Sequence, residues 1–513
     1  MTFQQLLDGV EVFCRSGNSS GGPSVRAIEY DSRRVKPGTV FVAMKGESSD
    51  GNRFIDQAIA AGAVAIVTDS AAETPGSEVT WAQVPHGRRA LARLSANFYQ
   101  RPAERIANTG ITGTNGKSTT AFIIESILKA AGRKTALVGT IEYHVAGKIL
   151  PAPHTTPESL ELNQLLAEGL ADGVTESVME VSSHALEQQR VFGIPFDVAV
   201  FTNLTRDHLD YHHTMDEYFR AKQVLFEGCG TEPPRAAILN SDDQYGRELL
   251  KFAGKKSELV FSYGLTAGDF HAELLQISPS GTRFQMASPA GNLAVWTPLI
   301  GQINVYNVLA AAAAAYARNC SPEAITKGIA NLARVPGRFE RVDCGQPFTV
   351  VVDYAHTDDA LRNLTALAHD FVAQAGFRGK VITLFCCGGD RDRAKRPLMG
   401  EAAGKGSDFV VLTSDNPRSE DPLAIINDAL VGLQKSGTKY AIEPDRRKAI
   451  ALAVAQATPG DIVLLAGKGH EKTQTSNGKS IPFDDVEVAR QTLVSLGYEC
   501  ALERRESRAE TTA

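Results

Sequence analysis

The chain has 513 residues, a hydrophobic fraction of 43%, a charged fraction of 22% and a formal net charge of −6. This is the composition of an ordinary globular protein, and the length predicts two to four domains. The acidic balance argues against a general binder of nucleic acid. It does not exclude a local basic pocket for a small anion.

The sequence also argues against membrane and disulfide-rich classes. The longest clearly apolar run, residues 308–317, is too short to cross a bilayer. No basic stretch followed by an apolar stretch opens the chain, so we expect no secretory signal. The seven cysteines are sparse and form no CxxC motif, which predicts neither a disulfide framework nor a zinc site and fits a reducing cytoplasm. We expect Cys386 and Cys387 to fill a buried strand.

Three α/β domains are predicted, at residues 1–103, 104–335 and 336–513. The first mixes strand-like runs (39–44 and 63–67) with helical stretches and ends near Arg101-Pro102. From Arg105, apolar strands alternate with amphipathic helices, the pattern of a mostly parallel sheet covered by helices. Its predicted strands are 106–112, 135–139, 177–181, 198–202 and 236–239. A second α/β unit follows Val335-Pro336-Gly337, with predicted strands at 348–353, 381–386, 409–412 and 462–465 and a frayed tail from Glu503.

The segment from Gly110 to Ser118 matches the phosphate-binding pattern G-x-x-x-x-G-K-[ST]. It lies between a predicted strand and a helical run, Thr119 to Ala131, as a P-loop requires. In a P-loop, backbone N–H groups and the helix N-terminus face the phosphates, Lys117 reaches the outer phosphates, and Ser118 can bind Mg²⁺. A chance glycine-rich turn fits this context less well. The motif predicts a nucleoside triphosphate site but does not name a reaction.

Polar residues also follow two other strands of the same predicted sheet. Glu180 ends one strand, and the segment from Asn203 to His213 follows another. Ligands of open α/β sheets bind at the carboxyl ends of strands, so Glu180 and His208 are candidate metal ligands beside the P-loop. Lys222, in an amphipathic stretch, is predicted from the sequence alone to be a solvated lysine. Ser182-Ser183-His184 suggests a hydrolase, but no G-x-S-x-G motif surrounds it.

Four polar clusters end successive strands in the last third of the chain. They are Asp353–His356, Gly388–Asp392, Asp415–Arg418 and Gly467–Glu471. Their arginines can bind carboxylates through two hydrogen bonds, and Asp415 and Glu471 can hold an ammonium group. The combination predicts a rim that binds a zwitterionic amino acid.

Taken together, these motifs resemble the Mur ligase family over nearly the whole chain, and in particular its diaminopimelate-adding members. The resemblance rests on Asp31-Ser32-Arg33, Gly38-x-x-Phe41, GTNGKST, His154-Thr155-Thr156-Pro157, EVSSHAL, NLTRDHLDYH, Ala221-Lys222, Asn304-x-x-Asn307, Gly337-Arg338-x-Glu340, DYAH, GGDRD, DNPR and GKGHE. It implies an N-terminal UDP-binding domain, a central P-loop ATPase domain and a C-terminal Rossmann-like domain. It also implies that ATP phosphorylates the D-glutamyl carboxylate of UDP-MurNAc-L-Ala-D-Glu. The amine of meso-diaminopimelate then attacks the acyl phosphate, a step of peptidoglycan precursor synthesis.

The resemblance further implies roles for individual residues. The implied catalytic residues are Lys117, Glu180, His208 and Lys222, and the implied Mg²⁺ ligands are Ser118, Glu180, His208 and a carbamylated Lys222. The implied ATP-binding residues are Gly113, Thr114, Asn115, Gly116, Lys117, Ser118, Thr119, Asn304, Arg338 and Asp353. Those implied for UDP-MurNAc-dipeptide are Tyr30, Ser32, Glu47, Ser48, Ser49, His154, Thr155, Thr156, Ser182, Gln188 and Arg190. Those implied for diaminopimelate are Arg391, Asp415, Asn416, Pro417, Arg418, Gly467 and Glu471.

Other functions stay open at this point. They are a lysine-adding or other Mur ligase, a ligase like folylpolyglutamate synthase, and a P-loop binding or switch protein without ligase chemistry. The expected partners are small molecules only, namely ATP with Mg²⁺, the UDP-linked dipeptide and diaminopimelate. We expect no nucleic acid, no membrane insertion, a monomer and a cytoplasmic location.

Overall fold

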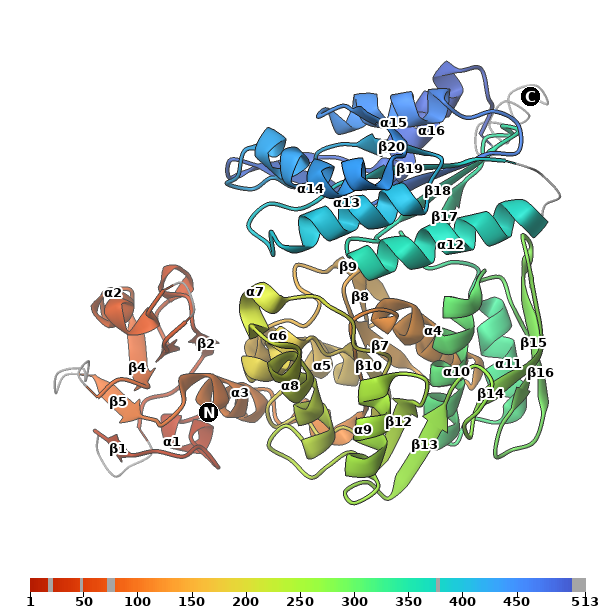
Figure 1. The fold of residues 1–513 in the computed structure, drawn as a ribbon. Coiled ribbons are helices and arrows are strands. Elements are labelled where there is room, and N and C mark those ends of the chain that lie inside the picture. The colour runs from red at the N-terminus through yellow and green to blue at the C-terminus, as the bar shows by residue number, and fades with distance from the viewer. Residues whose placement is uncertain (17–21, 47–48, 72–78, 375–378, 501–513) are drawn as a thin grey trace, which may run out of the picture.

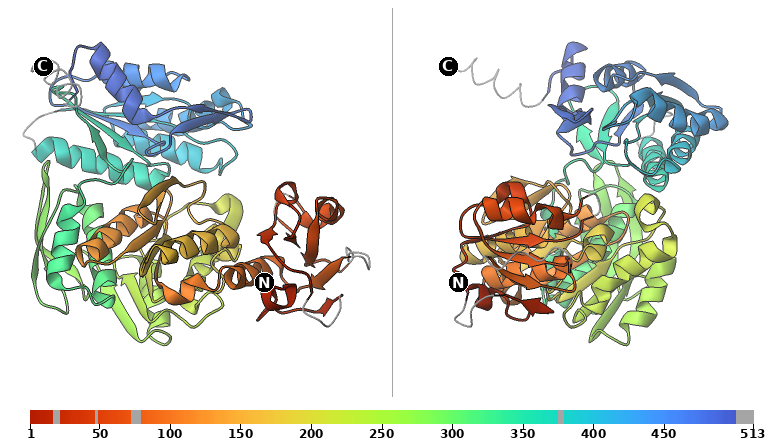
Figure 2. Two further views of the ribbon diagram at one scale, coloured as in Figure 1. Left: turned by 180° about the vertical axis from the view of Figure 1, so that it is seen from behind. Right: turned by 90° about the vertical axis from the view of Figure 1, so that its left-hand side faces the viewer.

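A computed structural model describes the chain except for residues 17–21, 47–48, 72–78, 375–378 and 501–513. Figure 1 shows three α/β parts: an N-terminal part to one side, a central part, and a C-terminal part above the central one. The views in Figure 2 show the same separation, with the C-terminal part stacked on the central part. The three-domain α/β architecture expected from the sequence is confirmed. The predicted tail lies outside the described residues.

The N-terminal part is built on a five-stranded sheet in the order β1-β5-β4-β3-β2. The predicted runs 39–44 and 63–67 are confirmed as β3 and β4, whose buried apolar residues form its core. Its elements are α1 (Phe3–Leu6), β1 (Cys14–Arg15), β2 (Ala27–Glu29), β3 (Thr39–Ala43), α2 (Ile55–Ala60), β4 (Ala63–Thr68), β5 (Thr80–Gln83) and α3 (Gly87–Phe98). A short 3-10 helix, Pro102–Arg105, leads into the central part.

The central part is an eight-stranded sheet in the order β13-β12-β11-β6-β10-β7-β8-β9, in which only β8 runs opposite to the other strands. All five predicted strands are confirmed. The strands are β6 (Ala107–Thr112), β7 (Thr135–Val138), β8 (Glu142–Val145), β9 (Lys148–Pro151), β10 (Glu176–Glu180), β11 (Val198–Phe201), β12 (Ala236–Asn240) and β13 (Leu259–Tyr263). Because the inner strands are covered on both faces, they are buried along nearly their whole length rather than at alternate residues.

Helices on the two faces of this sheet enclose separate hydrophobic cores. One face carries α4 (Lys117–Ala130), α10 (Gln302–Ala317) and α11 (Pro322–Asn331). The other carries α5 (Ser159–Ala171), α6 (Ser183–Glu187), α8 (Met215–Glu227) and α9 (Gln244–Ala253). The short α7 (Leu209–His212) precedes α8. The alanines of α10 let it pack closely on α4 in the middle of the core.

A three-stranded antiparallel sheet was not predicted. It consists of β14 (His271–Ser278), β15 (Gly281–Ala287) and β16 (Leu293–Thr297). Its strands mix polar and apolar residues and are partly exposed, so they lack the apolar runs that identified the buried strands.

The C-terminal part is a six-stranded sheet in the order β17-β18-β22-β19-β20-β21, parallel except for β17. Its four predicted strands are confirmed. The strands are β17 (Glu340–Val342), β18 (Thr349–Asp353), β19 (Val381–Phe385), β20 (Phe409–Leu412), β21 (Lys439–Ile442) and β22 (Ile462–Ala466). Helices α12 (Asp358–Gln374), α13 (Lys395–Lys405) and α14 (Pro422–Ser436) cover one face, and α15 (Arg446–Ala455) and α16 (Asp485–Ser495) the other. The hairpin of β23 (Thr473–Ser476) and β24 (Lys479–Pro482) extends from the loop after β22.

The cysteines follow the sequence-based expectation in part. Cys386 and Cys387 are buried, as expected, but they directly follow β19 instead of lying within a strand. No disulfide framework was expected, yet Cys344, in the loop after β17, is bonded to Cys500. In the part of the chain that the structure describes, no helix is long and apolar enough to span a membrane.

Candidate active site

The P-loop connects β6 to α4, as its motif predicts. Gly113 and Gly116 have φ angles of +143° and +88°, which side chains other than glycine rarely adopt. A Cβ at Gly116 would lie 2.5 Å from Oδ1 of Asn307 on α10. The two glycines therefore allow both the turn and the close approach of α10. The N-terminus of α4 faces the space where phosphates bind in such loops.

A half-buried lysine, Lys117, and a buried lysine, Lys222, meet at this loop. Lys117 Nζ donates to the carbonyl oxygens of Gly113 and Thr114 at 3.0 and 2.9 Å, and Lys222 Nζ donates to that of Gly113 at 2.9 Å. Lys222 on α8 is only 1% exposed, so the sequence-based expectation of a solvated lysine is wrong. Burial, with the mutual repulsion of Lys117 and Lys222, lowers the pKa of Lys222 well below its usual value. Burial also lowers the pKa of Lys117.

A cavity of about 250 Å³ opens in front of the loop, between the central and C-terminal parts. Every residue expected to bind ATP lines it except Gly113. These lining residues are Thr114, Asn115, Gly116, Lys117, Ser118, Thr119, Asn304, Arg338 and Asp353. Glu180 and His208 line the same cavity. The structure therefore brings residues as far apart in the sequence as Thr114 and Asp353, 239 positions, together around one cavity.

The C-terminal part contributes a cation to this cavity. Arg338 Nη2 donates to Ser118 Oγ at 3.1 Å, and its guanidinium lies 4.6 Å from the centre of the Tyr354 ring. Asp353, at the end of β18, accepts hydrogen bonds from the backbone N–H groups of Phe339 and Ala355. Burial raises the pKa of Asp353, although these bonds and Arg338 favour its charged form. Arg338 thus adds positive charge opposite the P-loop.

Ser118, Glu180 and His208 offer the donor types expected for a metal site. Glu180 accepts hydrogen bonds from the backbone N–H and hydroxyl of Thr140 at 2.8 and 3.0 Å, which fixes its carboxylate at the cavity wall. Burial lowers the pKa of His208 to about 3, so its imidazole is neutral, the form that binds metals. Among the described residues no three His, Cys, Asp or Glu side chains gather as a metal cluster. A hydroxyl, a carboxylate and an imidazole fit a metal that keeps further ligands from nucleotide phosphates and water.

Sequence reasoning missed Asp207 and Lys395. Lys395 Nζ, on α13, lies 3.4 Å from Asp207 Oδ1, and both side chains are buried. His208 and His356 lie 3.3 and 3.9 Å from the other oxygen of Asp207. Although burial favours the neutral acid, the ammonium group of Lys395 holds the pKa of Asp207 well below its usual value. Asp207 precedes a candidate metal ligand in the sequence, but no local pattern identifies a partner 188 residues away.

The residues expected to bind the UDP-linked dipeptide divide between two parts. In the central part, Thr155 and Ser182 line the cavity, and buried Thr156 accepts at its carbonyl oxygen from Arg190 at 2.9 Å. Arg190 also donates to Gln188 at 2.7 Å, while His154 is exposed. In the N-terminal part, Ser32 begins a 3-10 helix and Ser49 lies in an exposed loop. Tyr30 of this part donates its hydroxyl to Glu161 of α5 at 3.0 Å, so it lies where the two parts meet. Glu47 and Ser48 lie outside the described residues.

The residues expected to bind diaminopimelate gather at the strand ends of the C-terminal sheet. A Cβ at Gly388 would lie 3.1 Å from Arg418 Nη1, 3.7 Å from Asp415 Oδ2 and 3.8 Å from Arg391 Cγ. Asn416 Nδ2 donates to Glu471 Oε2 at 2.8 Å, and Pro417 connects Asn416 to Arg418. The backbone N–H of Gly467 donates to the carbonyl oxygen of Asp353 at 3.0 Å. This cluster therefore adjoins the cavity at Asp353.

Comparisons with known proteins agree with this arrangement. Three sequence families match the three parts: "Mur ligase family, catalytic domain" at residues 24–99, "Mur ligase middle domain" at 111–315, and "Mur ligase, glutamate ligase domain" at 337–469. A relative from Solibacter usitatus, named UDP-N-acetylmuramoyl-L-alanyl-D-glutamate–2,6-diaminopimelate ligase, is 54% identical over 97% of this chain and 99% of its own. A relative of the same name from Geobacillus thermodenitrificans is 46% identical over 96% of this chain and 99% of its own.

A solved structure extends the likeness to the fold. It is described as the structure of a UDP-N-acetylmuramoyl-L-alanyl-D-glutamate–2,6-diaminopimelate ligase and is 33% identical, with a TM-score of 0.67. The match covers 97% of this chain and 99% of that one. The similarity thus includes all three parts. The chain belongs to the Mur ligase family.

Proposed function

We propose that the chain is an ATP-dependent ligase that joins meso-diaminopimelate to UDP-MurNAc-L-Ala-D-Glu during peptidoglycan precursor synthesis. One observation carries the proposal: a cavity lined by the P-loop and by Arg338 and Asp353 adjoins a cluster of two arginines and two carboxylates. The first set suits ATP and the second suits a zwitterionic amino acid. The names of the close relatives support the same substrates.

The first step activates a carboxylate, which is a poor electrophile. Its oxygen attacks the γ-phosphorus of ATP, the bond to ADP breaks, and an acyl phosphate forms. Both reactants are anionic, so Lys117 and Arg338 reduce their repulsion from opposite sides of the cavity. Thr155, Ser182 and Arg190 are proposed to hold the dipeptide beside Glu180.

The second step forms the amide bond. The neutral amine of diaminopimelate attacks the acyl carbon, inorganic phosphate leaves, and the amine loses a proton. Arg391 and Arg418 are proposed to bind the carboxylate at the far end of the amino acid, and Asp415 and Glu471 its ammonium group. Since the two sites lie on different parts of the chain, closure between these parts would bring the amine to the acyl carbon.

Mg²⁺ and a modified Lys222 complete the proposal. Ser118, Glu180 and His208 are proposed to hold Mg²⁺, which when bound neutralises phosphate charge. The lowered pKa of Lys222 favours a neutral amine, which adds to CO₂ and releases a proton to give a carbamate. That anion would supply a further oxygen ligand and would compensate the neighbouring charge of Lys117. Ser182 and His184 need no hydrolase role in this scheme.

ADP release with UDP-MurNAc-L-Ala-D-Glu and ATP tests the function. We expect release to depend on meso-diaminopimelate and to be much slower with L-lysine. Lys117→Met should abolish it, while Lys129→Met, on the exposed end of the same helix, should keep it. Preference for lysine would contradict the specificity. ATP hydrolysis that needs no acceptor would favour a binding or switch protein instead.

We also propose domain boundaries near residues 103 and 335, which fall between the main sheets of the N-terminal, central and C-terminal parts. A cytoplasmic monomer with small-molecule substrates fits the proposed reaction, because ATP and nucleotide-linked precursors are cytoplasmic metabolites. Neither nucleic acid nor a membrane has a role in this scheme. Size-exclusion chromatography with light scattering would test the monomer.

A further inference from the structure

A fully buried lysine lies beneath the proposed diaminopimelate cluster. Lys468 follows β22 and has no exposed side-chain surface. Its Nζ lies 3.1 Å from Glu471 Oε2, 3.5 Å from Asp415 Oδ1 and 3.4 Å from Asn416 Oδ1. One ammonium group therefore contacts three of the residues proposed to bind the incoming amino acid.

Asp415 and Glu471 each contact Lys468 through only one carboxylate oxygen. Asp415 binds Lys468 through Oδ1, while Oδ2 points toward Gly388, where Arg418 converges. Glu471 binds Lys468 and Asn416 through Oε2. Asp415 and Glu471 are 15% and 29% exposed, whereas Lys468 is fully covered. The lysine thus lies on the protein side, and the remaining carboxylate oxygens are left for a ligand.

Other cations nearby do not balance these carboxylates. Arg446 is also buried, but it is paired with Asp485 through bonds of 2.8 and 2.6 Å. Among the described residues, Arg391 and Arg418 form no ion pair; they donate to the backbone oxygens of Asp390 and Gly389. Their charges are therefore free for ligand carboxylates, and Lys468 is the cation that compensates Asp415 and Glu471.

We propose that Lys468 is a positioning residue that sets the charge balance of the amino-acid site. This balance makes the site prefer an amino acid whose far end carries both an ammonium group and a carboxylate over one whose far end carries an ammonium group alone. With Lys468 in place, Asp415 and Glu471 together carry one uncompensated negative charge. This charge balances one ammonium group of the ligand, next to the ligand carboxylate that the arginines bind. Without it, the site gains a negative charge. That charge favours lysine, whose side chain ends in an ammonium group without a carboxylate. This inference rests on the proposed function.

Lys468→Met tests this, because methionine keeps the length and removes the charge. We expect the kcat/KM ratio of meso-diaminopimelate to L-lysine to fall at least tenfold, with the KM for ATP changed less than threefold. Lys472→Met is the matched control: the same substitution four residues on, at an exposed lysine paired with Asp484, should leave the ratio unchanged. An unchanged ratio in Lys468→Met, at any overall activity, would overturn the proposal.

A second comparison covers the case in which Lys468→Met does not fold. The single variant Glu471→Gln is compared with the double variant that carries both Lys468→Met and Glu471→Gln. These two differ only in the charge of Lys468, and the double variant leaves no carboxylate at position 471 without a cation. We expect the kcat/KM ratio of meso-diaminopimelate to L-lysine to be lower in the double variant than in Glu471→Gln. Equal ratios in the two variants would overturn the proposal. Failure of the unmodified enzyme to use diaminopimelate would instead contradict the proposed function itself.

Discussion

Lys222 in the central part and Lys468 in the C-terminal part are both fully buried, but their surroundings are opposite. Within the described residues, no carboxylate lies within ion-pair distance of Lys222. Its ammonium group donates to the carbonyl oxygen of Gly113 and lies 4.5 Å from the centre of the Tyr218 ring. Lys468 contacts two carboxylates and an amide oxygen. A buried cation is costly unless it is paired. Burial without a carboxylate therefore lowers the pKa of Lys222 and favours its neutral amine. The C-terminal site, by contrast, is already close to charge balance.

This difference fits the ligands proposed for the two sites. Phosphates, or a carbamate on Lys222 itself, supply the negative charge that the central site lacks. A zwitterion brings no net charge, and a site that receives it needs matched groups of both signs in fixed positions. Changing the charge at either site should therefore have different and measurable consequences.

Removal of the central lysine should have the largest effect. We expect Lys222→Ala to lower ligase turnover by about 10³-fold, because a group that stabilises charge in a buried site is lost. Short-chain carboxylates such as formate or acetate should restore part of the activity by occupying the vacated space with an anion. ADP release with and without added carboxylate measures both effects.

The control for this prediction is Lys251→Ala, at an exposed lysine on α9. It should keep full activity and should not respond to carboxylates. Full activity of Lys222→Ala would remove both the carbamate and its role in the central site.

At the C-terminal site, Arg418→Ala should have a smaller and more selective effect. Loss of a charge-assisted bond of about 1.5–3 kcal/mol lowers kcat/KM for diaminopimelate by roughly 10- to 100-fold. Binding of an ATP analogue, measured by calorimetry, should change little, because Arg418 does not line the nucleotide cavity. Arg447→Ala, at an exposed arginine on α15, is the matched control. Equal losses for both ligands would contradict the assignment of Arg418.

The two sites also differ in how far the sequence predicts them. The P-loop, the buried strands and the residues at strand ends follow from local patterns, since a parallel sheet brings the carboxyl ends of its strands to one edge. The pairs Asp207–Lys395 and Lys468–Asp415 join segments distant in the chain, and no local pattern reports such a contact. Local hydrophobicity likewise predicted a solvated Lys222, because burial of its charge depends on the P-loop packed against α8.

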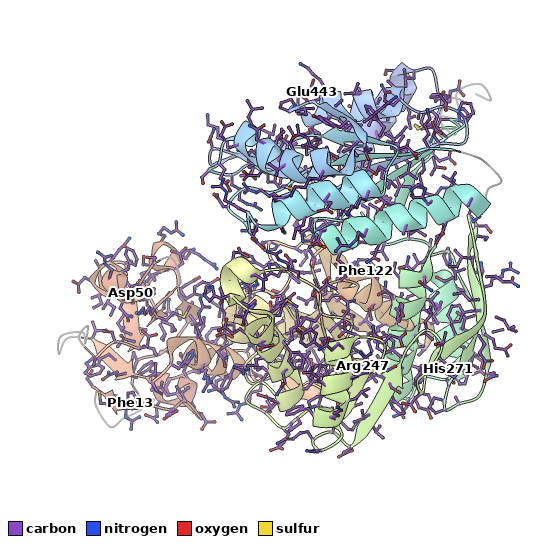
Figure 3. The ribbon with its side chains drawn as sticks, viewed as in Figure 1. Phe13, Asp50, Phe122, Arg247, His271 and Glu443 are labelled. Atoms are coloured by element: carbon purple, nitrogen blue, oxygen red, sulfur yellow. A yellow bond between two sulfur atoms is a disulfide. The ribbon has the colours of Figure 1, made fainter. Side chains whose placement is uncertain are left out.

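A histidine of the central part provides a milder test of charge compensation. His144 on β8 is held between Glu125 of α4 at 2.8 Å and Glu142 at 2.9 Å, and packs edge-on against Phe122, labelled in Figure 3. Burial alone would lower the pKa of His144, but its bonds to Glu125 and Glu142 raise it above 6.5. Despite burial, the same pairing lowers the pKa of Glu125 below 4.5.

These shifts fix the sign of the pH dependence. The raised pKa of His144 contributes stability that is fully present below about pH 6.5 and is lost as the pH rises through its folded value. The lowered pKa of Glu125 contributes stability that is present above about pH 4.5 and is lost as the pH falls through its folded value. We therefore expect His144→Gln to cost on the order of 1 kcal/mol of unfolding free energy between about pH 5 and 6, and less at pH 8.5.

Urea unfolding followed by circular dichroism at pH 5.5 and 8.5 measures this difference. His271→Gln is the control, because the partner of His271, Glu273, is half exposed and 3.6 Å away, so solvent screens that pair. A destabilisation by His144→Gln that is equal at both pH values would mean that His144 acts by packing against Phe122 alone. In that case the charge of half-buried His144 would not contribute to stability. Charge compensation by carboxylates would then matter only at the C-terminal site.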